Sequence, residues 1–556
     1  MDLCGSGRFG WVLALAALFV AVAPGIRGAD STEVDPTRMA ATVKILAADD
    51  FEGRSPGTAG EEKTRAYLID QFKSLGLKPA GVAGSWTQPV PLLQTRIVDG
   101  GNLSVTQKGR KVELARPDDI YVTTVRSVDR IDIKDAPIVF VGYGVTAPER
   151  KWDDFKGVDV RNKVVVMLVN DPDFAAERSE PVYGKFGGRR MTYYGRWVYK
   201  FEEAARHGAL AALVIHDTEP AGYPWSTVIA PGSQTYDVLN TPEKRVLLQG
   251  WLEGSAATAL FQRAGLDLAA LRVEARKANF HPIPLPATSF SASLSASHAV
   301  VQSANVLAKL EGKNRPEETV IFGAHWDAFG VGAADSQGRT IRHGANDDGI
   351  GVAGVLELAR IFSHEGPRQR TLVFGLWTAE ERGLLGSRAY TLSPTSPLEK
   401  TVANLTIDTL ETAGPARNII LVGEGQSDMD GRIRAAAAAQ NRTVTSEPYP
   451  ERGYFYRADH FPFAKRGVPT LVLMGGLAGP EELVNGGKAA GERWFSNYMQ
   501  CYHQPCDVWD ESWDLRGAAQ DVALLYAVGK ELADSAQWPA WSADSEFHRL
   551  GSKPAN

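Results

Sequence analysis

In the C-terminal half of the chain, short apolar runs stop where histidines and acidic residues begin. Examples are Thr319–Ala324, Thr371–Trp377 and Val402–Ile407. Uninterrupted apolar runs of this length that alternate with helical segments are typical of parallel strands covered on both faces. The pattern predicts an α/β fold with a mixed, largely parallel sheet sandwiched by helices, in which sites form outside the carboxyl ends of the strands.

The polar residues that follow these runs, and those in two loops, are of types that bind metal ions. In chain order, the candidate ligands are His325, Asp347, Glu381, Asp408 and His503. Two imidazoles and three carboxylates can hold two Zn²⁺ ions if one carboxylate is shared between them. The sequence therefore favours metal-assisted hydrolysis as the chemistry of the site.

Several of these residues also have a purely structural explanation. Asp347 or Asp348 could cap the helix that is predicted over about 349–362. Glu380 and Glu381 could be a solvated acidic pair, although their position directly after an apolar run argues against it. Because adjacent carboxylates repel each other unless a cation lies near, one of the two can bind metal while the other serves as a general base.

Asp327 is a candidate for orienting a metal ligand. It follows His325 by two positions, so in an extended chain both side chains project from the same side. From there its carboxylate can hold the imidazole in one tautomer.

Two cysteines, Cys501 and Cys506, flank His503. In an oxidising compartment they are expected to form a small disulfide loop or to remain free thiols. The alternative is that they supply sulfur ligands to a metal, but the chain has no second cysteine pair to complete a structural zinc site.

The N-terminal residues have the pattern of a secretory signal peptide. Arg8 precedes an apolar run from Trp11 to Ala23, and small residues follow up to Ala29. The run is shorter than the about 20 residues that cross a bilayer, so cleavage and a periplasmic or secreted protein without a stable membrane span are expected. An uncleaved membrane anchor is the alternative.

Composition excludes one class of partner. The chain is 44% hydrophobic and 23% charged, which is ordinary for a globular protein with an ample core. Its net charge is −6 and its basic residues form no stripe, so nucleic acid is not expected to bind.

From about residue 136 the chain forms a block without a metal-ligand cluster, and a Pro-rich connector follows at about Ile283. Its predicted strands cover residues 138–142, 163–169 and 209–216, and its predicted helix covers residues 200–207. This block is expected to be a separate domain. Within it, the segment 187–197 mixes arginines with aromatic rings. It either overhangs the site and holds a peptide carboxylate or side chain, or is a plain surface loop.

The chain resembles peptidase family M28, whose zinc peptidases include bacterial aminopeptidases and glutamate-carboxypeptidase-like enzymes. The stretches that carry the resemblance are GAHWD, GANDDGIGVAG, WTAEERGLLGS, NLTID, RADHFPFAKRGVP and YHQP. The middle block, with VFVGYG and KFEEAARHGALAALVIHD, is similar to the protease-associated domain inserted in many members. The implied division is a signal peptide at 1–29, the N-terminal part of the peptidase domain at 30–135, the β-rich insert at 136–285 and the main peptidase part at 286–545.

The resemblance implies a centre with two Zn²⁺ ions. Asp347 would bridge them, His325 and Asp408 would complete one site, and Glu381 and His503 the other.

It also implies roles for the residues around the ions. Glu380 would be the general base, Asp327 would orient His325, and Tyr502 would hydrogen-bond the developing oxyanion. The peptide bond between Asp347 and Asp348 would be cis.

The favoured function is a secreted zinc exopeptidase that acts on peptides, with an aminopeptidase preferred. A carboxypeptidase would use the same metals, a glutaminyl-cyclase-like acyltransferase would use one zinc, and a binding protein of the same architecture would use none for catalysis. The full ligand set and the retained base argue against the last two. The sequence leaves the oligomeric state open, a homodimer included.

Overall fold

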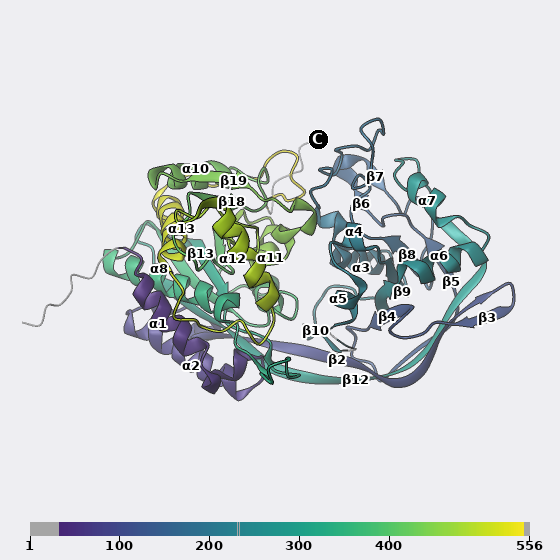
Figure 1. Cartoon of the computed structure of the whole chain (residues 1–556), viewed down its shortest axis with the longest axis horizontal. Helices are drawn as coiled ribbons and strands as arrows, with labels where there is room; N and C mark the ends of the chain where they lie inside the picture. Colours follow the sequence, from purple (N-terminus) through teal and green to yellow (C-terminus); the bar gives the residue numbers. More distant parts are fainter. Residues whose placement is uncertain (1–32, 231, 233, 550–556) are drawn as a thin grey trace, which may run out of the picture.

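The computed structural model describes residues 33–230, 232 and 234–549. The predicted signal peptide over residues 1–29 lies outside the described residues. The chain forms two lobes joined by the long strands β2 (Thr87–Gln107) and β12 (Ile283–Leu310), as Figure 1 shows. Across the described residues, every helix is too short or too polar to reach through a lipid bilayer.

One 14-stranded sheet runs through both lobes. The strands along its main path are, in order, β20 (Thr470–Leu473), β17 (Thr401–Ile407), β13 (Arg315–His325), β16 (Arg370–Trp377), β12, β5 (Arg130–Phe140), β8 (Val164–Leu168), β9 (Ala211–Ile215), β11 (Leu248–Leu252) and β4 (Ile120–Thr123). The run β20-β17-β13-β16 is parallel, and so is the run β5-β8-β9-β11. Strand β12 pairs antiparallel with both runs, so the sheet is mixed and largely parallel, as the sequence predicts.

Helices cover both faces of the first run, in the lobe that holds the candidate ligands. The covering helices are α1 (Pro36–Leu46), α2 (Ala59–Ser74), α8 (Gly351–Glu365) and α13 (Arg516–Asp534) on one face, and α9 (Leu385–Leu392) and α11 (His460–Lys465) on the other. Because successive side chains of a strand point to opposite faces, Phe322 packs in the cluster with α8 and α13, whereas Ile321 packs against Tyr390 and Phe463. Burial on both faces explains why these strands are uninterrupted apolar runs.

The second lobe is built around the parallel run β5-β8-β9-β11. One face packs against Phe201 of α3 (Trp197–Arg206), and the other against Phe261 of α6 (Gly254–Arg263). Helices α4 (Thr218–Ala221), α5 (Trp225–Ile229) and α7 (Leu268–Glu274) belong to this lobe too. Strand β4, N-terminal to the block expected at 136–285, joins the same sheet. The assignment of this block as a protease-associated domain stays a prediction.

One feature differs from the sequence expectations, and one pair of strands lies outside the main sheet. The segment expected to be a Pro-rich connector is the start of β12, where Pro284 lies opposite Val139 of β5. The residues after it alternate in burial, which is typical of a strand with one exposed face. The apolar run at 419–422 forms β18 (Asn418–Leu421), which pairs with β19 (Thr443–Ser446) outside the main sheet.

The remaining elements are short or lie at the edges. They are β1 (Lys78–Pro79), β3 (Arg110–Glu113), β6 (Thr146–Ala147), β7 (Trp152–Asp153), β10 (Gln234–Val238), β14 (Gly330–Val331), β15 (Ile341–Arg342), α10 (Met429–Ala439) and α12 (Gly487–Cys501).

Candidate metal centre

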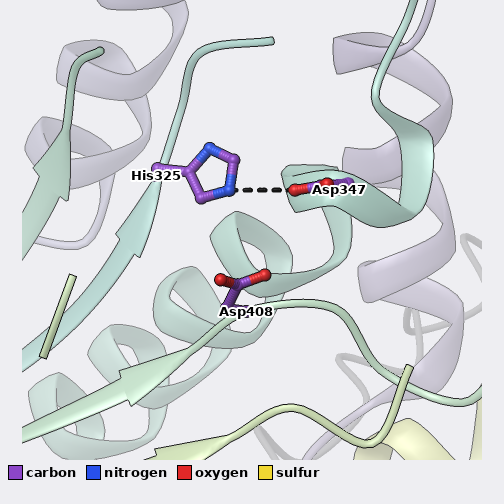
Figure 2. Close-up of side chains that lie close together, drawn as sticks. All are labelled: His325, Asp347 and Asp408. Carbon is purple, nitrogen blue, oxygen red and sulfur yellow. Dashed lines mark hydrogen bonds and ion pairs between the residues drawn. The ribbon is translucent and has the colours of Figure 1, made fainter. Parts of the chain in front are cut away.

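Three adjacent parallel strands deliver candidate ligands to one edge of the sheet. His325 is the last residue of β13, Asp408 directly follows β17, and Glu381 lies in the turn after β16. Because β17, β13 and β16 are neighbours with the same direction, their carboxyl ends meet. Asp347 reaches this edge from the segment before α8, and His503 from the loop after α12. Figure 2 shows His325, Asp347 and Asp408 converging.

The five predicted ligands form two groups that share Asp347. His325, Asp347 and Asp408 make one group, and Asp347, Glu381 and His503 make the other; within each, the ligand atoms lie within 4.8 Å of one another. Nε2 of His325 is 3.0 Å from Oδ1 of Asp347, while Nε2 of His503 is 3.2 Å from Oδ2. Each oxygen of this carboxylate therefore faces a different histidine.

The spacing of these atoms suits tetrahedral zinc. Ligand atoms each about 2.0 Å from a tetrahedral ion lie about 3.3 Å from one another. The Nε2 atom of His503 is 3.2 Å from Oε2 of Glu381, and the two contacts to Asp347 are similar. The donor set and its spacing therefore fit the metal that the sequence predicts.

Burial concentrates negative charge at this edge. Burial, and after it the nearby Asp347 carboxylate, raises the pKa of Asp408 to about 8. Burial also raises the pKa of Glu381 well above its usual range, again with Asp347 as the next cause. Among the described residues, no Lys or Arg nitrogen lies within ion-pair distance of these three carboxylates. A cluster of buried carboxylates needs a cation, and divalent metal ions meet that need.

Asp327 makes contacts with two residues of the centre. Its backbone carbonyl accepts a hydrogen bond of 3.0 Å from Nδ1 of His325, while its carboxylate is 3.7 Å from that nitrogen. Since a carbonyl can only accept, Nδ1 carries the proton and Nε2 is left with a lone pair for metal. The carboxylate itself accepts the backbone N–H of Glu380 at 3.0 Å. Oε2 of Glu380 lies 3.9 Å from Nε2 of His325.

The turn that carries Asp347 is held by a carboxylate that the sequence reasoning did not single out. Asp507 accepts the backbone N–H groups of Asn346 at 2.9 Å and of Asp347 at 3.0 Å. Asp348 belongs to neither ligand group and accepts the N–H of Gly351, the first residue of α8, at 2.9 Å. The helix-capping explanation thus describes Asp348, and the ligand explanation fits Asp347. The peptide bond between them is cis, as expected.

A second missed residue is Arg54, which is fully buried beneath the centre. Its guanidinium donates hydrogen bonds to backbone carbonyls on both sides of the ligand segments. The acceptors are the carbonyls of Leu46, Trp326, His343 and Gly344. Its partners are backbone groups, which leave no mark in the sequence. The one available signal was an isolated arginine in a Gly-rich loop.

Tyr502 and His503 lie inside a small covalent loop. Cys501 and Cys506 form a disulfide, which excludes them as metal ligands and settles the choice between bonded and free thiols. The rings of Tyr502 and His503 are 3.7 Å apart between centroids. Burial raises the pKa of Tyr502 well above its usual range, so its phenol stays protonated and can donate a hydrogen bond.

His460 belongs to neither ligand group. It is fully buried with its ring 4.8 Å from that of Phe455, and burial lowers its pKa to about 3. The neighbouring Asp459 accepts a hydrogen bond from the Ser387 hydroxyl. These contacts fit the structural role expected for His460.

Comparison with known proteins decides the family. Residues 305–527 match the model of peptidase family M28. The chain carries a peptidase domain of family M28. The matched residues include all five candidate ligands, together with Asp327, Glu380 and Tyr502.

Curated relatives match a short part of the chain. A vacuolar membrane protease from Saccharomyces cerevisiae (strain YJM789) is 39% identical over 104 residues, which is 19% of this chain and 10% of the relative. A probable zinc metalloprotease from Pyrenophora tritici-repentis is 41% identical over 88 residues, 16% of this chain and 20% of the relative. The chain thus matches a fifth or less of the length of these relatives.

Solved structures align over most of the chain at low identity. An aminopeptidase from Aneurinibacillus sp. strain AM-1 is 20% identical, with 95% of this chain and 99% of that chain covered and a TM-score of 0.47. A zinc aminopeptidase from Bacillus subtilis is 18% identical, with 93% and 99% covered and a TM-score of 0.42.

Proposed function

We propose that the chain is a zinc-dependent exopeptidase with two Zn²⁺ ions, and that it releases N-terminal residues from peptides. The observation that carries this proposal is the Asp347 carboxylate, whose two oxygens face different histidines in two ligand groups. One group would hold an ion through His325 and Asp408, the other through Glu381 and His503. The M28 match and a relative named as a probable zinc metalloprotease support zinc as the metal.

The residues around the ions would divide the work of hydrolysis. When bound, the ions would lower the pKa of a water molecule and polarise the scissile carbonyl. Glu380 would take a proton from the attacking water and return it to the leaving nitrogen. Burial raises the pKa of Glu380, which suits a group that must both accept and release a proton near neutral pH.

Two neighbours would assist these steps. Tyr502 would donate its phenol proton in a hydrogen bond to the developing oxyanion. Asp327 would hold two residues in place. Its carboxylate accepts the backbone N–H of Glu380, and its backbone carbonyl accepts the Nδ1 proton of His325. A carboxypeptidase would use the same set, so the end of the peptide that is attacked has to be measured.

The first experiment compares short peptides with free and acetylated N-termini. The wild-type protein, Glu380→Gln and a control, Glu399→Gln, are assayed with zinc content measured in each. Glu399 is exposed, so its isosteric change leaves the centre intact. We expect cleavage of the free peptides only, loss of at least about 100-fold in Glu380→Gln with zinc retained, and no change in the control.

Other results would redirect the proposal. Cleavage of both peptide types from the C-terminal end would make the protein a carboxypeptidase. Two bound zinc ions without turnover of any peptide would contradict the peptidase assignment.

Secretion and the insert belong to the same proposal. The N-terminal pattern supports export to the periplasm or medium with cleavage near residue 29. The parallel strands β5, β8 and β9, which are covered by their own helices, support the assignment of residues 136–285 as a protease-associated insert. N-terminal sequencing of the mature protein after cell fractionation would test the first point, because a retained leader or a cytoplasmic protein would contradict it.

A further inference from the structure

The second lobe packs against the M28 domain next to the candidate centre. The ring of Tyr193 lies 4.9 Å from that of Phe461 and 6.0 Å from that of Tyr456. Nζ of Lys465 forms an ion pair of 2.6 Å with Glu202 of α3. The start of α3 is therefore fixed beside the RADH segment of the M28 domain.

Each of these two segments carries an arginine without a counter-ion. Arg196 immediately precedes α3, and Arg457 opens the RADH segment. Both side chains are half-buried, and among the described residues neither guanidinium has a hydrogen-bond acceptor or a carboxylate within 4.0 Å. The Arg457 guanidinium lies over the face of Tyr454, at 5.3 Å from the ring centroid.

Three other arginines of the second lobe have partners. Arg189 lies 3.5 Å from Glu219, Arg190 donates to the carbonyl of Glu424, and Arg206, at the far end of α3, pairs with Glu203. Within the segment 187–197, Arg196 is thus the arginine whose charge is uncompensated by described residues. An unpaired guanidinium that is largely removed from water is costly unless a ligand supplies the counter-charge.

The two arginines are close to each other and to the residues proposed to act in hydrolysis. Burial lowers the pKa of Arg196 to about 10, and repulsion from Arg457 is the next cause. Burial also lowers the pKa of Arg457, but Tyr502, Tyr454, Tyr223 and Glu380 outweigh it and raise the pKa overall. Arg457 therefore lies within electrostatic reach of Tyr502 and Glu380, with Arg196 facing it from the other lobe.

We propose that Arg196 and Arg457 together bind a carboxylate of the substrate. Guanidinium groups pair with carboxylates in a bidentate geometry, and one anion between two arginines removes their mutual repulsion. Because Arg457 lies within electrostatic reach of Glu380, a carboxylate bound to it is close to the scissile bond. The preferred substrates are then dipeptides and other short peptides with a free C-terminus. This inference rests on the proposed function and names its substrate class.

The first test compares dialanine, alanyl-alanine amide and alanyl-aspartate amide. In the wild-type protein we expect kcat/KM for dialanine to exceed that for its amide by about tenfold or more, the usual effect of a charge-assisted contact. Arg196→Met should reduce this ratio toward one, mainly by raising KM for dialanine. Arg196→Lys should keep part of the preference.

Arg206→Met is the matched control, since it removes the same charge at the other end of α3 and should leave the ratio unchanged. Fast cleavage of alanyl-aspartate amide would show that a side-chain carboxylate is accepted; slow cleavage would restrict the pair to the C-terminus. Equal kcat/KM for dialanine and its amide in the wild-type protein would overturn the inference. Equal loss on both substrates in Arg196→Met would overturn it too.

Binding measurements distinguish a failure of this inference from a failure of the proposed function. Calorimetry with zinc-loaded Glu380→Gln protein should give about tenfold tighter binding of dialanine than of its amide, and adding Arg196→Met should abolish the difference. If no peptide is cleaved but this difference is found, the proposed function fails and the carboxylate site stands. If peptides are cleaved but both ligands bind equally, the carboxylate site fails and the proposed function stands.

Discussion

The backbone N–H of Glu380 donates a hydrogen bond of 3.0 Å to the carboxylate of Asp327. The carbonyl of Asp327 accepts the Nδ1 proton of His325 at the same distance. One residue thus fixes both a candidate ligand and the proposed base, although the three come from the ends of two different strands. Their relative position depends on the register between β13 and β16.

Asp327→Asn tests this dual contact. The amide keeps an acceptor for the Glu380 N–H and leaves the backbone carbonyl in place, but it removes the negative charge behind His325. We expect kcat to fall by about 10- to 100-fold while the zinc content is unchanged. Steady-state kinetics with metal analysis on the same samples would check this, and an unchanged kcat would show that the carboxylate charge has no part in positioning.

Asp507→Ala tests the support of the shared ligand. The change leaves the N–H groups of Asn346 and Asp347 without their acceptor. We expect about 1–3 kcal/mol lower stability in denaturant unfolding and about 10- to 100-fold weaker zinc binding in chelator competition. Asp507→Asn, which keeps one acceptor oxygen, should show a smaller loss. If Asp507→Ala behaved like the wild-type protein, the geometry of the turn would not depend on the Asp507 carboxylate.

The convergence of three candidate ligands is predictable because these residues follow strands with a clear signature. Continuous apolar runs identify β13, β16 and β17, and the parallel order of these strands brings His325, Glu381 and Asp408 together. Asp507 and Arg54 carry no such signature. Their partners are backbone groups, which lie 160 positions away for Asp507 and up to 290 for Arg54.

The long strands that join the lobes were predictable only in part. Strand β12 begins with two prolines, which are typical of a connector, and then alternates small polar and apolar residues. Its pairing with β2 over the residues from Thr288 to Val306 depends on the fold of both lobes. Local pattern alone could not supply that long-range pairing.

The disulfide next to His503 should affect one ligand group more than the other. Replacing Cys501 and Cys506 by serine removes a short covalent loop, which costs about 2 kcal/mol in the chain-entropy model. We expect the ion held by Glu381 and His503 to be lost at lower chelator concentration, while the ion held by His325 and Asp408 is retained. Chelator titration with metal counting would check this, and reduction of the wild-type protein should reproduce the result. Simultaneous loss of both ions would contradict independent ligand groups.

Arg54→Met should be the most destabilising of these changes. It removes a donor from four buried backbone carbonyls, of which Gly344 keeps the N–H of Gly349, and it removes the positive charge beneath the carboxylates of the centre. Each carbonyl left without a partner costs about 1–3 kcal/mol, so we expect a loss of at least about 3 kcal/mol in denaturant unfolding. Arg38→Met, an exposed arginine on α1, is the control and should change little. Because the Arg54 guanidinium ties Trp326 to Gly344, zinc affinity should fall in parallel with stability. A stable Arg54→Met protein with normal zinc content would show that the two ligand-bearing segments hold each other without it.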